Sequence, residues 1–282
     1  MRQQADSMVS TGFLRLLGAP AFEGGTMVQR FAAERVFQVI AYLAYKGDWV
    51  HRGVLAALFY GDHSEEAARR NLRKLLLRAR AFDWFACAFE ATRDSVRLHI
   101  GTDVQALLAA AREKSASTVL ELYRARLLDG LEAPECRGYS DWLEAERKRL
   151  QAHWRDAVFV LLAAAATPRE AIDLSARLLA ADAFDEAALR AHLAALSADG
   201  QTAQAQRAYR AYAARLAREL GVEPSLELQV FSGSVTHETP VQPRASPIAR
   251  TVDTDGFIGR VAELQQIGAL LAQADCRLLN LV

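Results

Sequence analysis

Cysteine is scarce in this chain of 282 residues, and long apolar runs are absent. The three cysteines, Cys87, Cys136 and Cys276, lie far apart and show no CxxC or cysteine–histidine spacing. This argues against a disulfide framework or a zinc site and is typical of a reducing compartment. No apolar run approaches the roughly 18 residues of a spanning helix, and residues 1–12 lack the apolar segment of a signal peptide. We therefore expect a cytoplasmic protein without membrane contact.

Catalytic motifs are also missing. The sequence contains no HExxH metalloprotease motif, no GxSxG nucleophile turn and no glycine-rich phosphate loop, and its six histidines are scattered. We therefore expect no catalytic residues, no metal and no cofactor in this chain.

Charge is balanced overall but unevenly distributed. The chain has 34 basic and 34 acidic residues. Residues 1–102 hold 14 bases and 10 acids, a net charge of +4, whereas residues 103–232 hold 16 and 19, a net charge of −3. A hydrophobic content of 51% is ordinary for globular proteins, and the length suggests about two domains. This asymmetry is expected if one domain meets nucleic acid and the other does not.

The basic excess includes the stretch 64–82, SEEAARRNLRKLLLRARAF. Read as a helix capped by Ser64, it places an apolar stripe on one side. That stripe consists of Ala68, Leu72, Leu75, Leu76 and Ala79. The opposite arc carries Arg69, Arg70, Arg73, Lys74 and Arg78. Such a helix can lie in a DNA major groove, with some side chains on phosphates and others on base edges.

A solvated outer face is the alternative interpretation of this arc. Solvated helix faces usually mix charges of both signs, yet no acid occurs from Ala67 to Phe82. Leu77 lies in the middle of the basic arc, where a groove could use it against a thymine methyl group. A helix covered by its own neighbours would exclude the DNA interpretation.

The flanking segments predict a winged helix. Residues 12–29 indicate two to four short antiparallel strands. A buried helix follows, containing Phe31 and ending at Gly47, and then a shorter helix over 50–60 with Val54, Leu55, Leu58 and Phe59 inward. Residues 85–100 predict two β-strands around a turn at 92–95, with Arg93 and Arg97 at or near the tip of this wing. In a winged helix the third helix enters the major groove and the hairpin reaches the backbone.

Residues 103–231 predict an all-α domain rich in alanine and leucine. A long helix begins around Tyr139. Thr167, Pro168 and Glu170 form a helix start with a capping box, and further breaks fall at Asp185, at 200–202 and at Gly221. Two residue pairs recur 34 residues apart, which is the period of tetratricopeptide helix pairs. A purely structural bundle remains the alternative.

Residues 55–82, LAALFYGDHSEEAARRNLRKLLLRARAF, resemble the OmpR/PhoB-type winged helix of bacterial SARP-like and AfsR-like activators. The resemblance lies in Leu58-Phe59, the following loop, and the run from Ala68 to Arg73. Phe59 stands where tryptophan is usual, and 94–96 replaces the commoner glycine-tyrosine of the wing. The resemblance implies binding to double-stranded DNA at direct repeats near a promoter. It also implies contact with RNA polymerase through Gly61, Asp62 and His63, in a bacterial, nucleoid-associated protein.

Residues 184–228, ending in the Leu220-Gly221-Val222-Glu223-Pro224 close, are similar to the end of the bacterial transcriptional activation domain. The resemblance implies a module for protein binding and self-association, so a homo-oligomer is expected. Residues 232–256, with three prolines, predict a linker. Residues 257–282 resemble the start of a STAND-type nucleotide-binding domain, although a local helical appendage is the alternative. The chain ends before any P-loop, so we expect a fragment of a larger regulator, and ATP would bind only that longer protein.

The sequence thus predicts a mainly α protein in four parts: a winged helix-turn-helix over 1–102 with a small antiparallel sheet and a β-hairpin wing, an all-α tetratricopeptide-like domain over 103–231, the linker, and the truncated domain. We interpret it as a sequence-specific DNA-binding transcription activator. The predicted DNA-binding residues are Arg69, Arg70, Asn71, Arg73, Lys74, Arg78, Arg93 and Arg97. Two alternatives remain: an interaction scaffold whose winged helix has lost DNA binding, and the receiver fragment of a nucleotide-regulated signalling ATPase.

Overall fold

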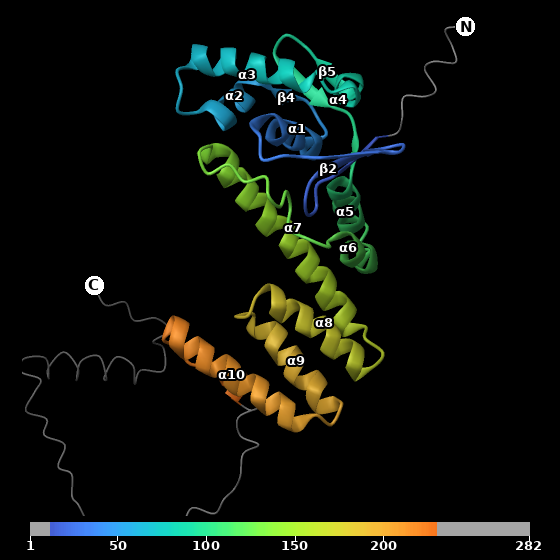
Figure 1. Ribbon diagram of the computed structural model, residues 1–282. Coiled ribbons are helices and arrows are strands. Elements are labelled where there is room, and N and C mark those ends of the chain that lie inside the picture. The colour runs from blue at the N-terminus through green and yellow to red at the C-terminus, as the bar shows by residue number, and fades with distance from the viewer. Residues whose placement is uncertain (1–11, 230–282) are drawn as a thin grey trace, which may run out of the picture. The chain divides into compact units, whose positions relative to one another are not determined.

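The computed structural model describes residues 12–229, so the predicted linker and the predicted start of a nucleotide-binding domain lie outside the described residues (Figure 1). The N-terminal elements are β1 (Phe13–Arg15), β2 (Ala21–Gly24), β3 (Met27–Arg30), α1 (Arg35–Lys46), β4 (Val50–His51), α2 (Arg52–Tyr60), α3 (Glu65–Ala79), α4 (Asp83–Ala88), β5 (Phe89–Ala91), β6 (Ser95–Leu98) and β7 (Gly101–Thr102). The elements that follow are α5 (Asp103–Arg112), α6 (Ala116–Leu122), α7 (Arg137–Ala163), α8 (Pro168–Ala181), α9 (Glu186–Ala198), α10 (Thr202–Leu220) and α11 (Leu226–Gln229).

Two small sheets frame the first helices. One has the strand order β3-β2-β1-β7, and the other has the order β4-β6-β5. The predicted antiparallel strands of residues 12–29 are β1, β2 and β3, whereas β7 pairs parallel to β1 and was not predicted. Sheet, helices, hairpin and the helical region after them confirm the predicted fold class of a winged helix followed by helices.

The helix α1 ends where the sequence predicts. Gly47 has φ +62° and donates its N–H to the carbonyl of Leu43 at 3.0 Å, so it closes the helix in the left-handed conformation that glycine tolerates. Phe31 was predicted inside this helix, but α1 begins at Arg35. The Phe31 ring instead stacks on Phe37, with 4.7 Å between the ring centroids.

Two local predictions were wrong. Val54 is 50% exposed, because the buried residues of α2 share one arc of the helix and Val54 lies outside it. Residues 85–88 were predicted as strand but belong to α4. There Phe85 is fully buried and Trp84 stacks on Phe22 at 4.3 Å, so packing overrides local β-propensity.

The main hydrophobic core does not end at the winged helix. It continues into α5 and into α7, where Tyr139 is fully buried. The Tyr139 ring lies 5.3 Å from that of Phe59, and Trp142 lies 4.7 Å from Tyr42. The helix α7 is therefore packed directly against α1 and α2, the two helices on which α3 packs.

The helices α8, α9 and α10 pack successively on one another, and α8 and α9 also pack against the end of α7 (Figure 1). A buried cluster there includes Leu193, Leu196 and Tyr212. The ends of these helices lie where the sequence predicts. Thr167 caps α8, Asp185 caps α9, and Gly221, with φ +68°, ends α10. Within residues 12–229 no helix is both long and apolar enough to cross a bilayer.

Candidate nucleic-acid interface

The helix α3 is held from behind by the stripe that the sequence predicts. Its five members are at most 5% exposed: Ala68, Leu72, Leu75, Leu76 and Ala79. They face α1 and α2, the two helices on which α3 packs. The Ser64 hydroxyl accepts the Ala67 N–H at 3.4 Å at the start of the helix, and Glu65 and Glu66 lie in its first turn, where the helix dipole favours acids.

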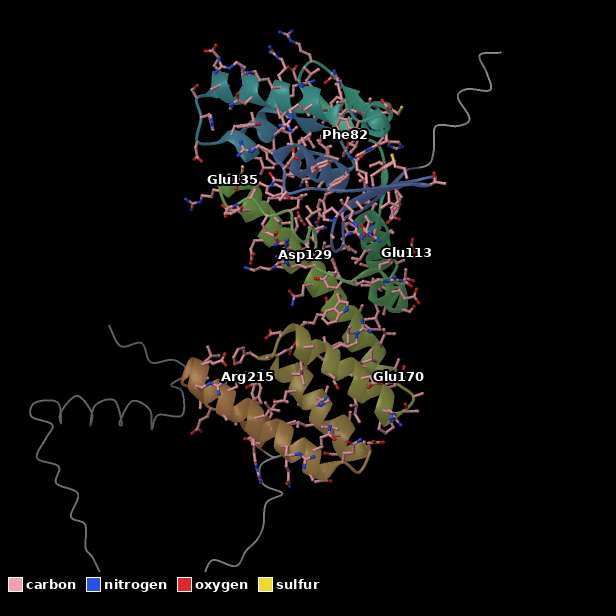
Figure 2. The ribbon with its side chains drawn as sticks, viewed as in Figure 1. Phe82, Glu113, Asp129, Glu135, Glu170 and Arg215 are labelled. Carbon is pink, nitrogen blue, oxygen red and sulfur yellow. The ribbon has the colours of Figure 1, made fainter. Side chains whose placement is uncertain are left out.

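The outer side of α3 is uncovered. We call it the recognition face and define it by Arg69, Arg70, Arg73, Lys74, Leu77 and Arg78, all of which are exposed. Side chains ending in nitrogen project outward along α3 in Figure 2. Leu77 is 69% exposed at the centre of this face, whereas Asn71 is half-buried beside it. The neighbouring helices leave the face free, as binding to a duplex requires.

Two cations of the recognition face have carboxylate partners. Arg69 pairs with Glu65 one turn earlier, and Arg78 lies 3.1 Å from Glu34. Both arginine side chains are about two-thirds exposed, at 67% and 65%. Such surface pairs contribute little, so phosphates could replace the carboxylates. Among the described residues, Arg70, Arg73 and Lys74 have no ion-pair partner.

The wing is a short hairpin between β5 and β6. Its turn is closed by the N–H of Thr92 to the carbonyl of Ser95 at 2.9 Å, and by the N–H of Ser95 to the Thr92 hydroxyl at 3.0 Å. Arg93 lies exposed at the tip, as predicted. Arg97 lies back on β6 and donates to both carboxylate oxygens of Glu90, at 2.8 and 2.9 Å.

The guanidinium of Arg97 also lies 4.9 Å from the ring centroid of Trp49. The Arg97 side chain is only 28% exposed, and its contacts with Glu90 and Trp49 fix it at the base of the wing. It does not lie at the tip.

A groove of about 780 Å³ separates the recognition face from the wing. We call it the arginine groove because five arginines line it: Arg52, Arg69, Arg73, Arg80 and Arg93. Asp94 is the one acidic residue among its lining residues. The groove thus brings together three of the predicted residues, whereas Arg70, Asn71, Lys74, Arg78 and Arg97 lie outside its lining.

Arg52 and Arg80 were missed by the sequence analysis. Arg80 directly follows α3 and continues its basic run, which was a usable signal. Arg52 opens α2 and reaches the groove only through the fold, because β4 pairs with β6 and thereby sets the start of α2 beside the wing. No local pattern marks that proximity.

The predicted polymerase loop is the turn between α2 and α3. Gly61, Asp62 and His63 are exposed, and the His63 N–H donates to the carbonyl of Tyr60 at 3.0 Å. A Cβ at Gly61 would lie 2.8 Å from the carbonyl oxygen of Ala57, so a larger residue here would shift the end of α2.

A larger hollow, of about 990 Å³, lies between the β2–β3 hairpin, α4 and the start of α5. Its lining mixes apolar rings with charges of both signs, such as Lys46 and Asp83, and contains none of the predicted DNA-binding residues. We therefore place the candidate interface at the recognition face despite the larger volume here. Among residues 12–229, no group of three or more histidines, cysteines and acids is placed to hold a metal ion.

Comparison with known proteins identifies a family and a similar solved structure. The model of the bacterial transcriptional activator domain matches residues 88–235, in agreement with the resemblance seen in residues 184–228. A structure of Mycobacterium tuberculosis EmbR in complex with a low affinity phosphopeptide is similar at 18% identity and a TM-score of 0.49, covering 79% of this chain. The similar region is 64% of the EmbR chain, less than two thirds of its length. No curated protein matches the sequence.

Proposed function

Because this chain belongs to the bacterial transcriptional activator domain family, whose members are regulators and not enzymes, we propose that it binds specific DNA sequences and activates transcription. The recognition face of α3 enters the major groove, and the wing lies against the neighbouring backbone. The observation that carries this proposal is the uncovered recognition face beside the arginine groove.

The basic residues of the recognition face have different roles, depending on their position along α3. Recognition helices read bases mainly with their N-terminal residues, and Arg70 is exposed there without an ion-pair partner among the described residues. We assign base reading to Arg70, with Asn71 beside it. Lys74, Arg78 and Arg93 then contact phosphates, and Arg97 joins them only by exchanging its Glu90 partner for a phosphate. Leu77 meets a thymine methyl group.

Two other parts of the chain contact partner proteins in this proposal: the helical domain and the turn before α3. The helical domain serves self-association and protein contact, since stacked helix pairs present extended surfaces to other proteins. Self-association would place two recognition helices on direct repeats near a promoter. RNA polymerase contacts the exposed turn Gly61–His63, which directly precedes α3.

Selection of bound duplexes from a random pool tests the DNA proposal. The chain should enrich a defined motif, with a repeat spacing if two copies bind side by side. Affinity for that motif should fall steeply with salt, because phosphate contacts release counterions. Arg70→Ala should cost about 1–3 kcal/mol on the selected site and relax the preference at one base position. The matched control is Arg177→Ala, which removes an exposed arginine of α8.

Negligible affinity at low salt would overturn the proposal in favour of an interaction scaffold. Binding that enriches no motif would leave DNA binding but remove sequence-specific activation.

A further inference from the structure

Three of the arginines that line the arginine groove lie close to one another. Arg52 is the first residue of α2, Arg73 lies in the middle of α3, and Arg80 directly follows α3. Each comes from a different position in the chain, and the fold brings Arg73 and Arg80 near enough to Arg52 for their charges to act on it across the groove.

The backbone and side chain of Arg52 fix it in place. Its backbone N–H donates to the carbonyl of Asp94 at 2.8 Å, and its Nη2 donates to the carbonyl of Thr92 at 3.3 Å. The Nε of Arg52 is shielded from solvent and has no hydrogen-bond partner among the described residues. One hydrogen bond thus anchors the guanidinium to the wing, and because Nε is shielded, an incoming acceptor would meet its Nη donors.

The cluster repels itself. Burial and then the positive charges of Arg80 and Arg73 lower the pKa of Arg52, while the Asp94 carboxylate acts in the opposite direction. An arginine nevertheless remains protonated at neutral pH. Three positive charges with one opposing carboxylate raise the free energy of the folded protein until an anion enters between them.

We propose that Arg52, Arg73 and Arg80 form a clamp for a single backbone phosphate of the bound duplex, between α3 and the wing. This inference rests on the proposed function and adds two residues to its DNA contacts. Guanidinium forks match phosphate oxygens in pairs. Arg80 is steadied for this role by the Phe89 ring, whose centroid lies 4.8 Å from its Cζ.

The clamp predicts opposite signs for two neighbouring substitutions. Arg52→Gln removes one donor fork and weakens DNA binding, whereas Asp94→Asn removes the carboxylate that opposes the phosphate and tightens it by roughly two- to fivefold. Because a phosphate contact carries no sequence information, both changes should be equal on the selected duplex and on a random duplex.

Affinity measured against salt tests the clamp with DNA. The slope of log affinity against log salt counts the phosphates that the protein neutralises, and the clamp assigns all three arginines to one phosphate. Arg52→Gln and Arg80→Gln should therefore each weaken DNA binding while lowering the slope by less than one, and the double variant should lower it by no more than about one. Arg177→Gln is the control that should leave affinity and slope unchanged. If the wild type binds DNA and both groove variants keep its affinity, or the double variant lowers the slope by about two, the clamp is wrong and the proposed function stands.

Thermal unfolding without DNA tests the clamp independently. At low salt, Arg52→Gln should melt no lower than the wild type, because the substitution relieves repulsion. Pyrophosphate, compared with chloride at equal ionic strength, should stabilise the wild type and Arg177→Gln more than Arg52→Gln. Equal stabilisation of all three overturns the clamp. Preferential stabilisation together with no DNA binding at low salt overturns the proposed function and the assignment of the clamp to DNA.

Discussion

Asp103 joins the first strand of the winged helix to α5. Its carboxylate accepts the N–H groups of Leu16 and Leu17, at 2.8 and 3.0 Å, and the N–H of Val104 at 2.9 Å. Burial raises the pKa of Asp103 while these three donors act to lower it. The side chain thus satisfies backbone groups at the end of β1 that would otherwise be buried without partners.

Asp103→Asn should destabilise the protein by about 1–3 kcal/mol, because the amide NH₂ replaces one acceptor and leaves a buried N–H unsatisfied. Urea unfolding at neutral pH measures the change. Asp173→Asn, on an exposed position of α8, is the control and should stay within about 0.5 kcal/mol. A similar small change for Asp103→Asn would show that the three hydrogen bonds contribute no net stability.

His192 predicts a pH dependence for the helical domain. It is half-buried, its Nδ1 lies 2.9 Å from the Ser175 hydroxyl, and burial lowers its pKa below the ordinary value of 6.5. The unfolded chain therefore takes up a proton at a higher pH than the folded chain. The stability that neutral His192 contributes is fully present at a pH above its ordinary pKa of 6.5. It is lost as the pH falls from there through the lower pKa of the folded state.

Urea unfolding at about pH 7.5 and pH 5.5 should therefore show a smaller loss of stability on acidification in His192→Asn than in the wild type. An identical loss in both proteins would assign the acid sensitivity to other groups.

At the scale of elements, local chemistry predicted most helix ends. The Thr167 hydroxyl accepts the Glu170 N–H at 3.2 Å, and the Glu170 carboxylate accepts the Ala166 N–H at 3.1 Å. Both groups lie within five residues of one another, so the sequence alone carries the signal. The apolar stripe and basic arc of α3 were predictable for the same reason, because helical periodicity is local.

Thr167→Ala should cost about 1 kcal/mol by removing the N-cap of α8, and Thr167→Ser should retain most of that stability because it keeps the hydroxyl. Chemical unfolding of the two variants separates the cap from the packing of the threonine methyl group. Equal losses in both would assign the effect to the methyl group.

The elements that the sequence analysis missed depend on distant partners. The helix α4 forms where β-rich residues predict a strand, since Trp84 stacks on Phe22 and donates to Gln29 at 2.9 Å, more than fifty residues earlier. Arg52 reached the arginine groove through pairing of β4 with β6. Neither contact can be recognised from the pattern of a short stretch of sequence.

At the scale of the whole described chain, the winged helix and α7 share one core. Glu135, labelled in Figure 2 and located just before α7, has a carboxylate oxygen 3.7 Å from the guanidinium of Arg35 in α1. A Cβ at Gly138 would come within 3.1 Å of the Leu58 carbonyl oxygen in α2. Charge asymmetry and composition separated two regions of sequence, but they could not show that α2, which supports α3, is itself supported by α7.

This shared core predicts that residues 1–102 alone are less stable than residues 1–165, although both contain every proposed DNA-binding residue. The shorter fragment exposes the rings of Phe59 and Tyr42, which lose Tyr139 and Trp142, and each buried aromatic side chain contributes on the order of 2–3 kcal/mol. Thermal unfolding should give a lower midpoint for 1–102, and its affinity for the selected duplex should fall as its folded fraction falls. Equal midpoints for the two fragments would mean that the winged helix folds without α7, and that the contact between them serves only to hold the helical domain in position.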